Sequence, residues 1–498
     1  MKRALLASYA TQAYVGLIGL VLMPVYMRYM GVEAFGMVGL FLMLQAWLQL
    51  LDFGLSPSLS REMSLYRAGI LDAAAAWDRL RGLECVLGAI ALLAVLGLLV
   101  ARNWIATDWL RPKHLAVNEV SQCIIAMTLA AAARWLAGIY RAALIGLERQ
   151  LSINAAMTAF ATLKFAGVIP LLIFWSAAPL VFFSYQASIG ALELAVFAAL
   201  MYRVLPGSAA TVLPSVSALR GMLPVAGAMA FMSGMWVFLT QIDKLILSRV
   251  LSLDVFGYYT VAVAAAGSVL ALVPPLNQVL QPRMTILAAQ GRHAELNRLY
   301  CMATQFSTVA FAAVGGGLAL FAEPALWAWT GSRTVASEAA PILFWYGLAN
   351  GLIGLLALPF MLQFAHGYLR LHVIGNIVLG VTLLPALAFA ALHYGAAGAG
   401  AVLFFANLAF LLLWVPLAYR RLIRDLVWRW FVQDVMPAAS VTLFVLSLVA
   451  AIMPVEQERL QAGVLVVGAI LLSASAGLLA GRRTREFVVN TVFRKDAA

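Results

Sequence analysis

Three ionisable side chains stand inside long apolar segments of this sequence, namely Arg134, Lys164 and Glu193. A charge in hydrocarbon costs roughly 2.5–3.5 kcal/mol on insertion scales, so an ionisable residue kept there is a candidate for function. Cations in such a place can bind an anionic group. For Lys164 and Glu193 two interpretations stay open: a neutral structural pair between two helices, or a phosphate-binding or ion-coupled pair.

A polar stripe accompanies these charges. Gln45, Gln49 and Asp52 follow one another at i, i+4 and i+7, which places them on one face of an otherwise apolar helix. Such a stripe suits a cavity that binds hydroxyl groups, and hydrogen bonding between helices is the alternative interpretation. The pair Asp243 and Lys244 lies near the end of its apolar segment. Three interpretations of this pair stay open: a gate, an ion-coupling site and a plain interfacial salt bridge.

The elements that must position these residues are membrane-spanning helices. Of the 498 residues, 64% are hydrophobic and 11% charged, whereas soluble domains carry about 25% charged residues. Apolar runs of about 20 residues, the length that crosses a bilayer, recur along the whole chain. We expect an all-α polytopic membrane protein with about 14 helices, over 5–27, 35–55, 82–101, 119–140, 151–174, 179–201, 221–248, 256–280, 300–322, 339–362, 371–393, 398–419, 435–453 and 461–480.

The distribution of cations predicts how the chain is oriented. With the N-terminus in the cytoplasm, the cytoplasmic segments hold 23 of the 33 Lys and Arg residues, the opposite side 7 and the helices 3. This asymmetry is what the positive-inside rule requires, so we expect both termini in the cytoplasm. The same rule accounts for the net charge of +12 without a nucleic-acid partner. The 3 Cys and 5 His residues are scattered, so we expect no metal site and no cofactor.

An internal repeat predicts the domain organisation. Arg28, Glu33, Phe35 and Gly36 fit the pattern R-x4-[ED]-x-F-G, which returns 221 residues later from Arg249 to Gly257. Arg61 has a counterpart in Arg283, one residue further on. This offset spans six helices, an even number, which predicts two parallel repeats around a central cavity. We therefore expect a first lobe over 1–205, a cytoplasmic linker over 206–217, a second lobe over 218–420, and two further helices with a cytoplasmic tail over 421–498.

The first 70 residues resemble those of a known family. Gly31-Val-Glu-Ala-Phe-Gly36 precedes an apolar helix that ends in Leu51-Asp-Phe-Gly-Leu-Ser-Pro57, and Arg61 follows. This start and the two six-helix repeats resemble the Wzx-type oligosaccharide flippases, in the polysaccharide transporter branch of the multidrug/oligosaccharidyl-lipid/polysaccharide (MOP) exporter superfamily. The two additional helices depart from a 12-helix plan and resemble the lipid II flippases, whose N-terminal Arg/Ser signature is absent here.

The resemblance implies that an undecaprenyl-pyrophosphate-linked oligosaccharide repeat unit moves from the cytoplasmic to the periplasmic leaflet of the bacterial inner membrane by alternating access. It implies as partners the lipid-linked oligosaccharide, membrane lipid, and a polymerase and chain-length regulator of one pathway, with the transporter a monomer. A proton or sodium gradient is the candidate energy source. On this interpretation the residues that bind pyrophosphate or sugar are Arg134, Lys164, Arg61, Arg141, Gln45, Gln49 and Gln12. The residues that couple ions to transport or gate the cavity are Asp52, Glu193, Asp243, Lys244, Arg28 and Arg249.

Two other functions are weighed against the flippase. A cation-coupled drug antiporter of the same superfamily should present acidic residues to a cationic substrate, whereas Arg134 and Lys164 are basic. A membrane glycan polymerase, ligase or glycosyltransferase usually needs a sizeable outer loop with catalytic residues. The longest predicted outer loop, from Arg102 to about Asn118, carries no paired carboxylates. The sequence therefore favours a transporter over an enzyme.

Overall fold

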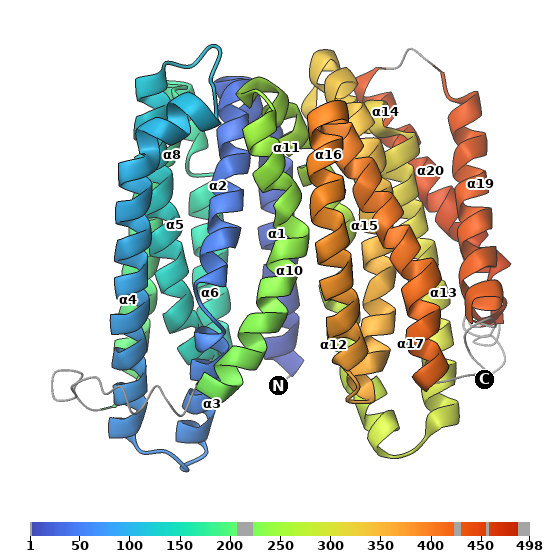
Figure 1. Cartoon of the computed structure of the whole chain (residues 1–498), viewed down its shortest axis with the longest axis horizontal. Coiled ribbons are helices and arrows are strands. Elements are labelled where there is room, and N and C mark those ends of the chain that lie inside the picture. The colour runs from blue at the N-terminus through green and yellow to red at the C-terminus, as the bar shows by residue number, and fades with distance from the viewer. Residues whose placement is uncertain (1, 207–222, 423–429, 455–457, 487–498) are drawn as a thin grey trace. The chain divides into compact units, whose positions relative to one another are not determined.

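The computed structural model describes residues 2–206, 223–422, 430–454 and 458–486, and every regular element in these ranges is a helix (Figure 1). A helix satisfies its own backbone hydrogen bonds, as a chain in lipid must. Twelve helices of the described part are long and apolar enough to span a membrane, which confirms the all-α polytopic class. The predicted number of 14 is approximate: the segments 371–393 and 398–419 share one of the twelve spans, and the segment 221–248 is not among them.

The chain forms two compact units, Met1–Gly257 and Tyr258–Ala498. The elements of the first unit are α1 (Lys2–Met30), α2 (Val32–Leu50), α3 (Leu55–Arg67), α4 (Ala73–Trp104), η1 (Ile105–Trp109), α5 (Val117–Gly146), α6 (Gln150–Phe165), α7 (Ile169–Phe174), α8 (Pro179–Val204) and α10 (Leu223–Val250). Helix α11 (Leu253–Leu270) begins in the first unit and continues into the second. The predicted linker over 206–217 lies, except for Pro206, outside the described residues. The lobe boundaries drawn from the repeat stay a prediction.

The second unit contains α12 (Val273–Ala289), α13 (His293–Leu320), α14 (Ala322–Thr330), α15 (Arg333–Ala365), α16 (Arg370–Ala409), η3 (Phe410–Trp414), α17 (Val415–Leu422), η5 (Trp430–Val435), α19 (Met436–Ile452) and α20 (Arg459–Ala480). Gly395, with φ 62° and ψ −150°, breaks α16 into two helices. This break falls between the segments 371–393 and 398–419, which the sequence separates.

Three consecutive glycines make α13 the centre of the second unit. Successive residues of a helix point about 100° apart, so Gly315, Gly316 and Gly317 face three different neighbours. A Cβ atom on Gly315 would lie 2.8 Å from the carbonyl oxygen of Gly347 in α15. On Gly316 it would lie 2.6 Å from Leu443 in α19, and on Gly317 2.5 Å from Ile470 in α20. Because these three glycines carry no side chains, α15, α19 and α20 can all approach α13 closely.

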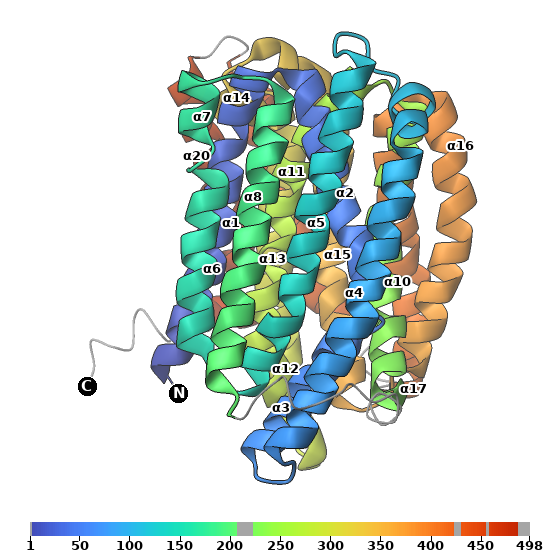
Figure 2. The same ribbon diagram turned by 90° about the vertical axis from the view of Figure 1, so that its left-hand side faces the viewer.

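In the first unit, α6, α8, α5 and α4 lie side by side in Figure 2. Helices α5 and α8 meet at small residues: a Cβ atom on Gly190 would lie 3.2 Å from the carbonyl oxygen of Ala130. Helix α1 is joined to α6 by side-chain hydrogen bonds along its length, between Ser8 and Asn154 (2.9 Å), Thr11 and Thr158 (3.3 Å), and Tyr14 and Thr162 (2.8 Å). Polar groups that would be costly in lipid are therefore used between helices.

The predicted helix over 35–55 is interrupted. Helix α2 ends at Leu50 and α3 begins at Leu55, and between them Phe53 (φ 47°) and Gly54 (φ 70°) adopt left-handed backbone conformations. Non-helical backbone is tolerated at membrane depth only where it is buried in protein or lines a cavity. Asp52 lies in this break, so its side chain is placed by the interruption and not by a continuous helical stripe.

The two copies of the repeated motif contact each other. In the first copy only Gly31, with φ 85°, separates α1 from α2, and Gly36 lies inside α2. A Cβ atom on Gly36 would lie 2.5 Å from the carbonyl oxygen of Leu253, and one on Gly257 would clash with the carbonyl oxygen of Val32. The repeated spacing of the motif thus places two glycines where α2 and the start of α11 touch.

Candidate functional site

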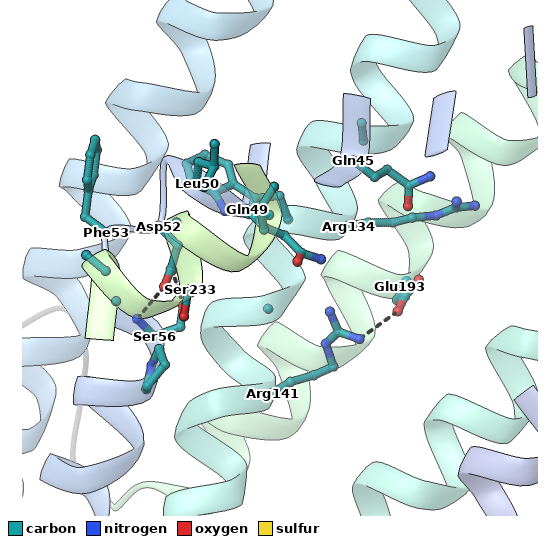
Figure 3. Close-up of a pocket in the computed structure, with 18 of the residues that line it drawn as sticks. Gln45, Gln49, Leu50, Asp52, Phe53, Ser56, Arg134, Arg141, Glu193 and Ser233 are labelled. Atoms are coloured by element: carbon teal, nitrogen blue, oxygen red, sulfur yellow. Dashed lines mark hydrogen bonds and ion pairs between the residues drawn. The ribbon is translucent and has the colours of Figure 1, made fainter. Parts of the chain in front are cut away.

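A cavity of about 440 Å³ lies within the first unit, and its lining residues come from α2, α3, α5, α6, α8, α10 and the break after α2 (Figure 3). Cavities of 300–1,000 Å³ are typical of sites for small molecules and headgroups. Ionisable and amide side chains line this one, among them Gln49, Asp52, Arg134, Lys164 and Glu193. Most of them lie on helices far apart in the sequence.

The cationic side of the cavity is centred on Glu193 of α8. Its side chain is only 3% exposed, and its carboxylate lies 3.2 Å from Nζ of Lys164 on α6. The other carboxylate oxygen lies 3.9 Å from a guanidinium nitrogen of Arg141 on α5, an ion pair drawn as a dashed line in Figure 3. The predicted contact between Lys164 and Glu193 is therefore present, but it is not an isolated neutral pair, because a second cation shares the carboxylate.

Arg134 adds a third cation from α5. It donates to the side-chain oxygen of Gln186 on α8, and its guanidinium lies 5.3 Å from the ring centre of Phe41. Gln186 in turn donates through Nε2 to the backbone oxygen of Lys164 at 3.0 Å. One amide side chain thus ties Arg134 to the segment of α6 that carries Lys164. The buried Nε of Arg134 has no hydrogen-bond partner.

The opposite side of the cavity is acidic and hydroxyl-rich. Asp52 accepts hydrogen bonds from the Oγ (2.5 Å) and the backbone nitrogen (3.2 Å) of Ser56, which closes the first turn of α3. Ser233 of α10 lies next to Asp52 and Ser56, and Gln49 lies between these two residues and Glu193 (Figure 3). The cavity can therefore accept an anion on one side and hydroxyl donors on the other.

Over half of the residues expected at a site line this cavity. These are Gln45, Gln49, Asp52, Arg134, Arg141, Lys164 and Glu193. The sequence places them on or at the ends of four separate predicted helices, and the packing of α2, α5, α6 and α8 gathers them. Their roles in binding or ion coupling stay predictions, because their proximity is compatible with either role.

The other expected residues lie elsewhere. Gln12 and Arg28 are exposed on α1. Arg61 is exposed on α3 and pairs with Glu62 at 3.0 Å. None of these three lines the cavity described here, so the structure does not bring them to the other candidates.

The expected gating residues of α10 also lie apart from the cavity. Asp243 is buried, and Lys244 donates to the backbone oxygen of Thr240 on its own helix at 2.7 Å. The guanidinium of Arg249 lies 5.2 Å from the ring centre of Trp109 and donates to the backbone oxygen of Asp108. Arg249 therefore joins η1 to the end of α10.

Two contributions to the cavity were not predicted. Gln186 shares a helix face with Glu193, but its role in holding Arg134 depends on the distance between α5 and α8. The part of α10 around Ser233 was predicted to belong to another lobe, yet it lines this cavity. A signal existed for Ser233, since it occupies the position of the repeat that matches Gln12.

Sequence comparison identifies the family. A family model described as "Polysaccharide biosynthesis protein" matches residues 3–287, more than half of the chain and all of the cavity-lining segments. The chain belongs to the polysaccharide biosynthesis protein family. No curated protein matches its sequence significantly.

Solved structures of similar fold come from transporters. The lipid II flippase MurJ in an inward closed conformation is 12% identical, with a TM-score of 0.68 over 95% of this chain and 98% of that one. An inward-facing multidrug resistance MATE family transporter of the MOP superfamily is 14% identical, with a TM-score of 0.66 over 82% and 94%. A MATE transporter of Vibrio cholerae is 16% identical, with a TM-score of 0.55 over 85% and 97%.

These similarities establish the fold of this polysaccharide biosynthesis family member. It is a multi-pass membrane protein with the architecture of MOP-superfamily flippases and transporters. At 12–16% identity the likeness concerns the fold alone, and the substrate must be argued from the cavity.

Proposed function

We propose that this protein is a flippase that moves an undecaprenyl-pyrophosphate-linked oligosaccharide repeat unit from the cytoplasmic to the periplasmic leaflet by alternating access. The observation that carries the proposal is the cationic side of the cavity. Arg141 and Lys164 share one buried carboxylate, that of Glu193, and Arg134 lines the same cavity, in a member of a family of polysaccharide biosynthesis proteins. An excess of cations at membrane depth is costly unless an anion compensates it.

The chemistry of the cargo suits both sides of the cavity. A pyrophosphate bridge carries ionised oxygens that guanidinium and ammonium groups bind through charge-assisted hydrogen bonds. Sugar hydroxyls both donate and accept, and Gln45, Gln49, Asp52 and Ser233 offer partners for both. The polyprenyl chain would remain in lipid, because its transfer into a polar cavity would remove it from its apolar surroundings.

The cellular setting follows from the same proposal. Both termini would lie in the cytoplasm and the protein in the bacterial inner membrane, beside the polymerase and chain-length regulator that use the exported units. A proton or sodium gradient is the proposed energy source, with Asp52 and Glu193 as its candidate sites. Reporter fusions at both ends test the topology, and ionophores specific for either ion test the source of energy.

The central experiment is complementation of a deletion strain. The double variant Arg134→Ala/Lys164→Ala should reduce repeat-unit export by an order of magnitude or more, because two of the three cavity cations are lost. Arg292→Ala is the matched control, since that arginine pairs with Glu295 at an exposed helix end and does not line the cavity. Normal export by the double variant, at wild-type protein levels, would contradict the proposal.

A cation-coupled drug antiporter is the second candidate. It is favoured by the similarity in fold to MATE transporters and by the two carboxylates of the cavity, Asp52 and Glu193. On that function, deletion would sensitise the cells to cationic drugs and leave surface glycan unchanged. The flippase proposal expects the reverse.

A further inference from the structure

Glu193 is a buried anion in a cavity that the proposed function assigns to an anionic headgroup. The residue is 2% exposed, whereas the side chains of Lys164 and Arg141 are 21% and 32% exposed. All three side chains line the cavity, and the carboxylate is the least accessible of them. The two cations are therefore more accessible to a ligand than the carboxylate that pairs with them.

The contacts of Glu193 are unequal. Its hydrogen bond to Lys164 is 3.2 Å long, whereas Arg141 at 3.9 Å is beyond hydrogen-bond distance and also lies 5.8 Å from the ring centre of Phe197. Arg134 is held by Gln186, and within the described part of the chain the ion pairs of this carboxylate are with Lys164 and Arg141. One carboxylate thus compensates three neighbouring cations incompletely.

We infer that Glu193 is a resident counter-ion, which occupies Lys164 and Arg141 when the cavity is empty and competes with the diphosphate of the cargo for them. This inference rests on the proposed function. A diphosphate offers more oxygens than a carboxylate and can reach Arg134 as well, so it binds in preference. When the cargo leaves, Glu193 pairs again with Lys164, which lowers the repulsion among the cations. The residue therefore weakens binding and favours release.

Competition predicts that removal of the carboxylate charge tightens binding. In full-length protein in lipid nanodiscs, we expect Glu193→Gln to bind undecaprenyl pyrophosphate about tenfold more tightly or better, a difference that one lost competing ion pair can produce. Net flipping should nevertheless slow, because release becomes limiting. Inorganic pyrophosphate, used as a competitor without lipid, should show the same gain.

Two variants test the assignment to this one carboxylate. Lys164→Met/Glu193→Gln removes the cation and anion together, so its affinity should return to within a few fold of wild type. Glu84→Gln is the matched control: Glu84 also pairs with an arginine, Arg81 at 3.1 Å, but does not line the cavity, so affinity should not change. If Glu193→Gln does not fold, Glu193→Asp, whose carboxylate is drawn back by one methylene, should tighten binding by a few fold.

The outcomes separate this inference from the proposed function. Unchanged or weaker binding by Glu193→Gln, or by Glu193→Asp where only that variant folds, overturns the counter-ion role, even if Arg134→Ala still weakens binding as the flippase proposal requires. If wild type and Arg134→Ala both fail to bind undecaprenyl pyrophosphate, the proposed function fails and the inference fails with it. Tighter binding by Glu84→Gln of the same size would also overturn the inference.

Discussion

Gly36 and Gly257, which occupy the same position of the internal repeat, pack against each other's helices. A Cβ atom on Gly36 would lie 3.2 Å from the backbone nitrogen of Gly257 and 2.5 Å from the carbonyl oxygen of Leu253. Glu33 of the same motif accepts hydrogen bonds from the backbone nitrogens of Lys113, His114 and Leu115. The repeated motif therefore joins α2, the start of α11 and the segment before α5 in one junction.

Gly36→Ala should destabilise this junction. The added methyl group meets backbone atoms that cannot rotate away, so we expect a loss of about 1–3 kcal/mol in the free energy of unfolding, as for overpacked cores. Thermal unfolding in detergent measures it. Gly88→Ala is the control, because nothing lies within 4 Å of a Cβ atom there and alanine favours a helix. Equal midpoints for the two variants would refute the close packing.

Lys164→Met should cost more stability than the double variant Lys164→Met/Glu193→Gln. The single substitution leaves the buried Glu193 with only the distant Arg141, and an uncompensated buried charge costs up to about 3–5 kcal/mol. We expect a loss of roughly 1–3 kcal/mol in the single variant, since Arg141 compensates in part. Unfolding midpoints of both variants test this, and a less stable double variant would contradict the pairing.

Gln186→Leu should impair transport without lowering the amount of protein in the membrane. The leucine removes the acceptor that holds Arg134 and the donor to the backbone of Lys164, so the guanidinium loses its fixed position. We expect repeat-unit export to fall roughly tenfold, the effect of about 1.4 kcal/mol. Gln186→Glu keeps an acceptor and should retain more activity at the same expression. Equal export by Gln186→Leu and wild type would show that Arg134 needs no such support.

Gly317→Leu should loosen α20 from α13. A side chain at this position meets Ile470, which a Cβ atom alone would approach to 2.5 Å. The cost should be about 1–3 kcal/mol of overpacking, measured as a lower unfolding midpoint. Gly468→Leu, at a position of α20 with nothing within 4 Å of a Cβ atom, should be nearly neutral. The hydrogen bonds from Arg483 and Thr484 to Gln305 would still hold the end of α20, so complete unfolding is not expected.

Composition and charge pattern determined the class of this protein, because lipid admits apolar helices and few charges regardless of how the helices pack. The sequence alone also singled out Arg134, Lys164 and Glu193, since a charge inside an apolar segment is visible without a structure. It separated the two helices that Gly395 divides, because polar and glycine residues mark that boundary.

Only the tertiary structure decided which of these residues meet. Asp52 faces the cavity because Phe53 and Gly54 break α2, a local conformation that the helical spacing of Gln45 and Gln49 could not indicate. Gln12 and Asp243 satisfy the same sequence criteria and lie outside the cavity. The reason is physical: spacing fixes which face of one helix a residue occupies, whereas the rotation and distance between helices depend on contacts such as Gly190 with Ala130, made between segments far apart in the chain.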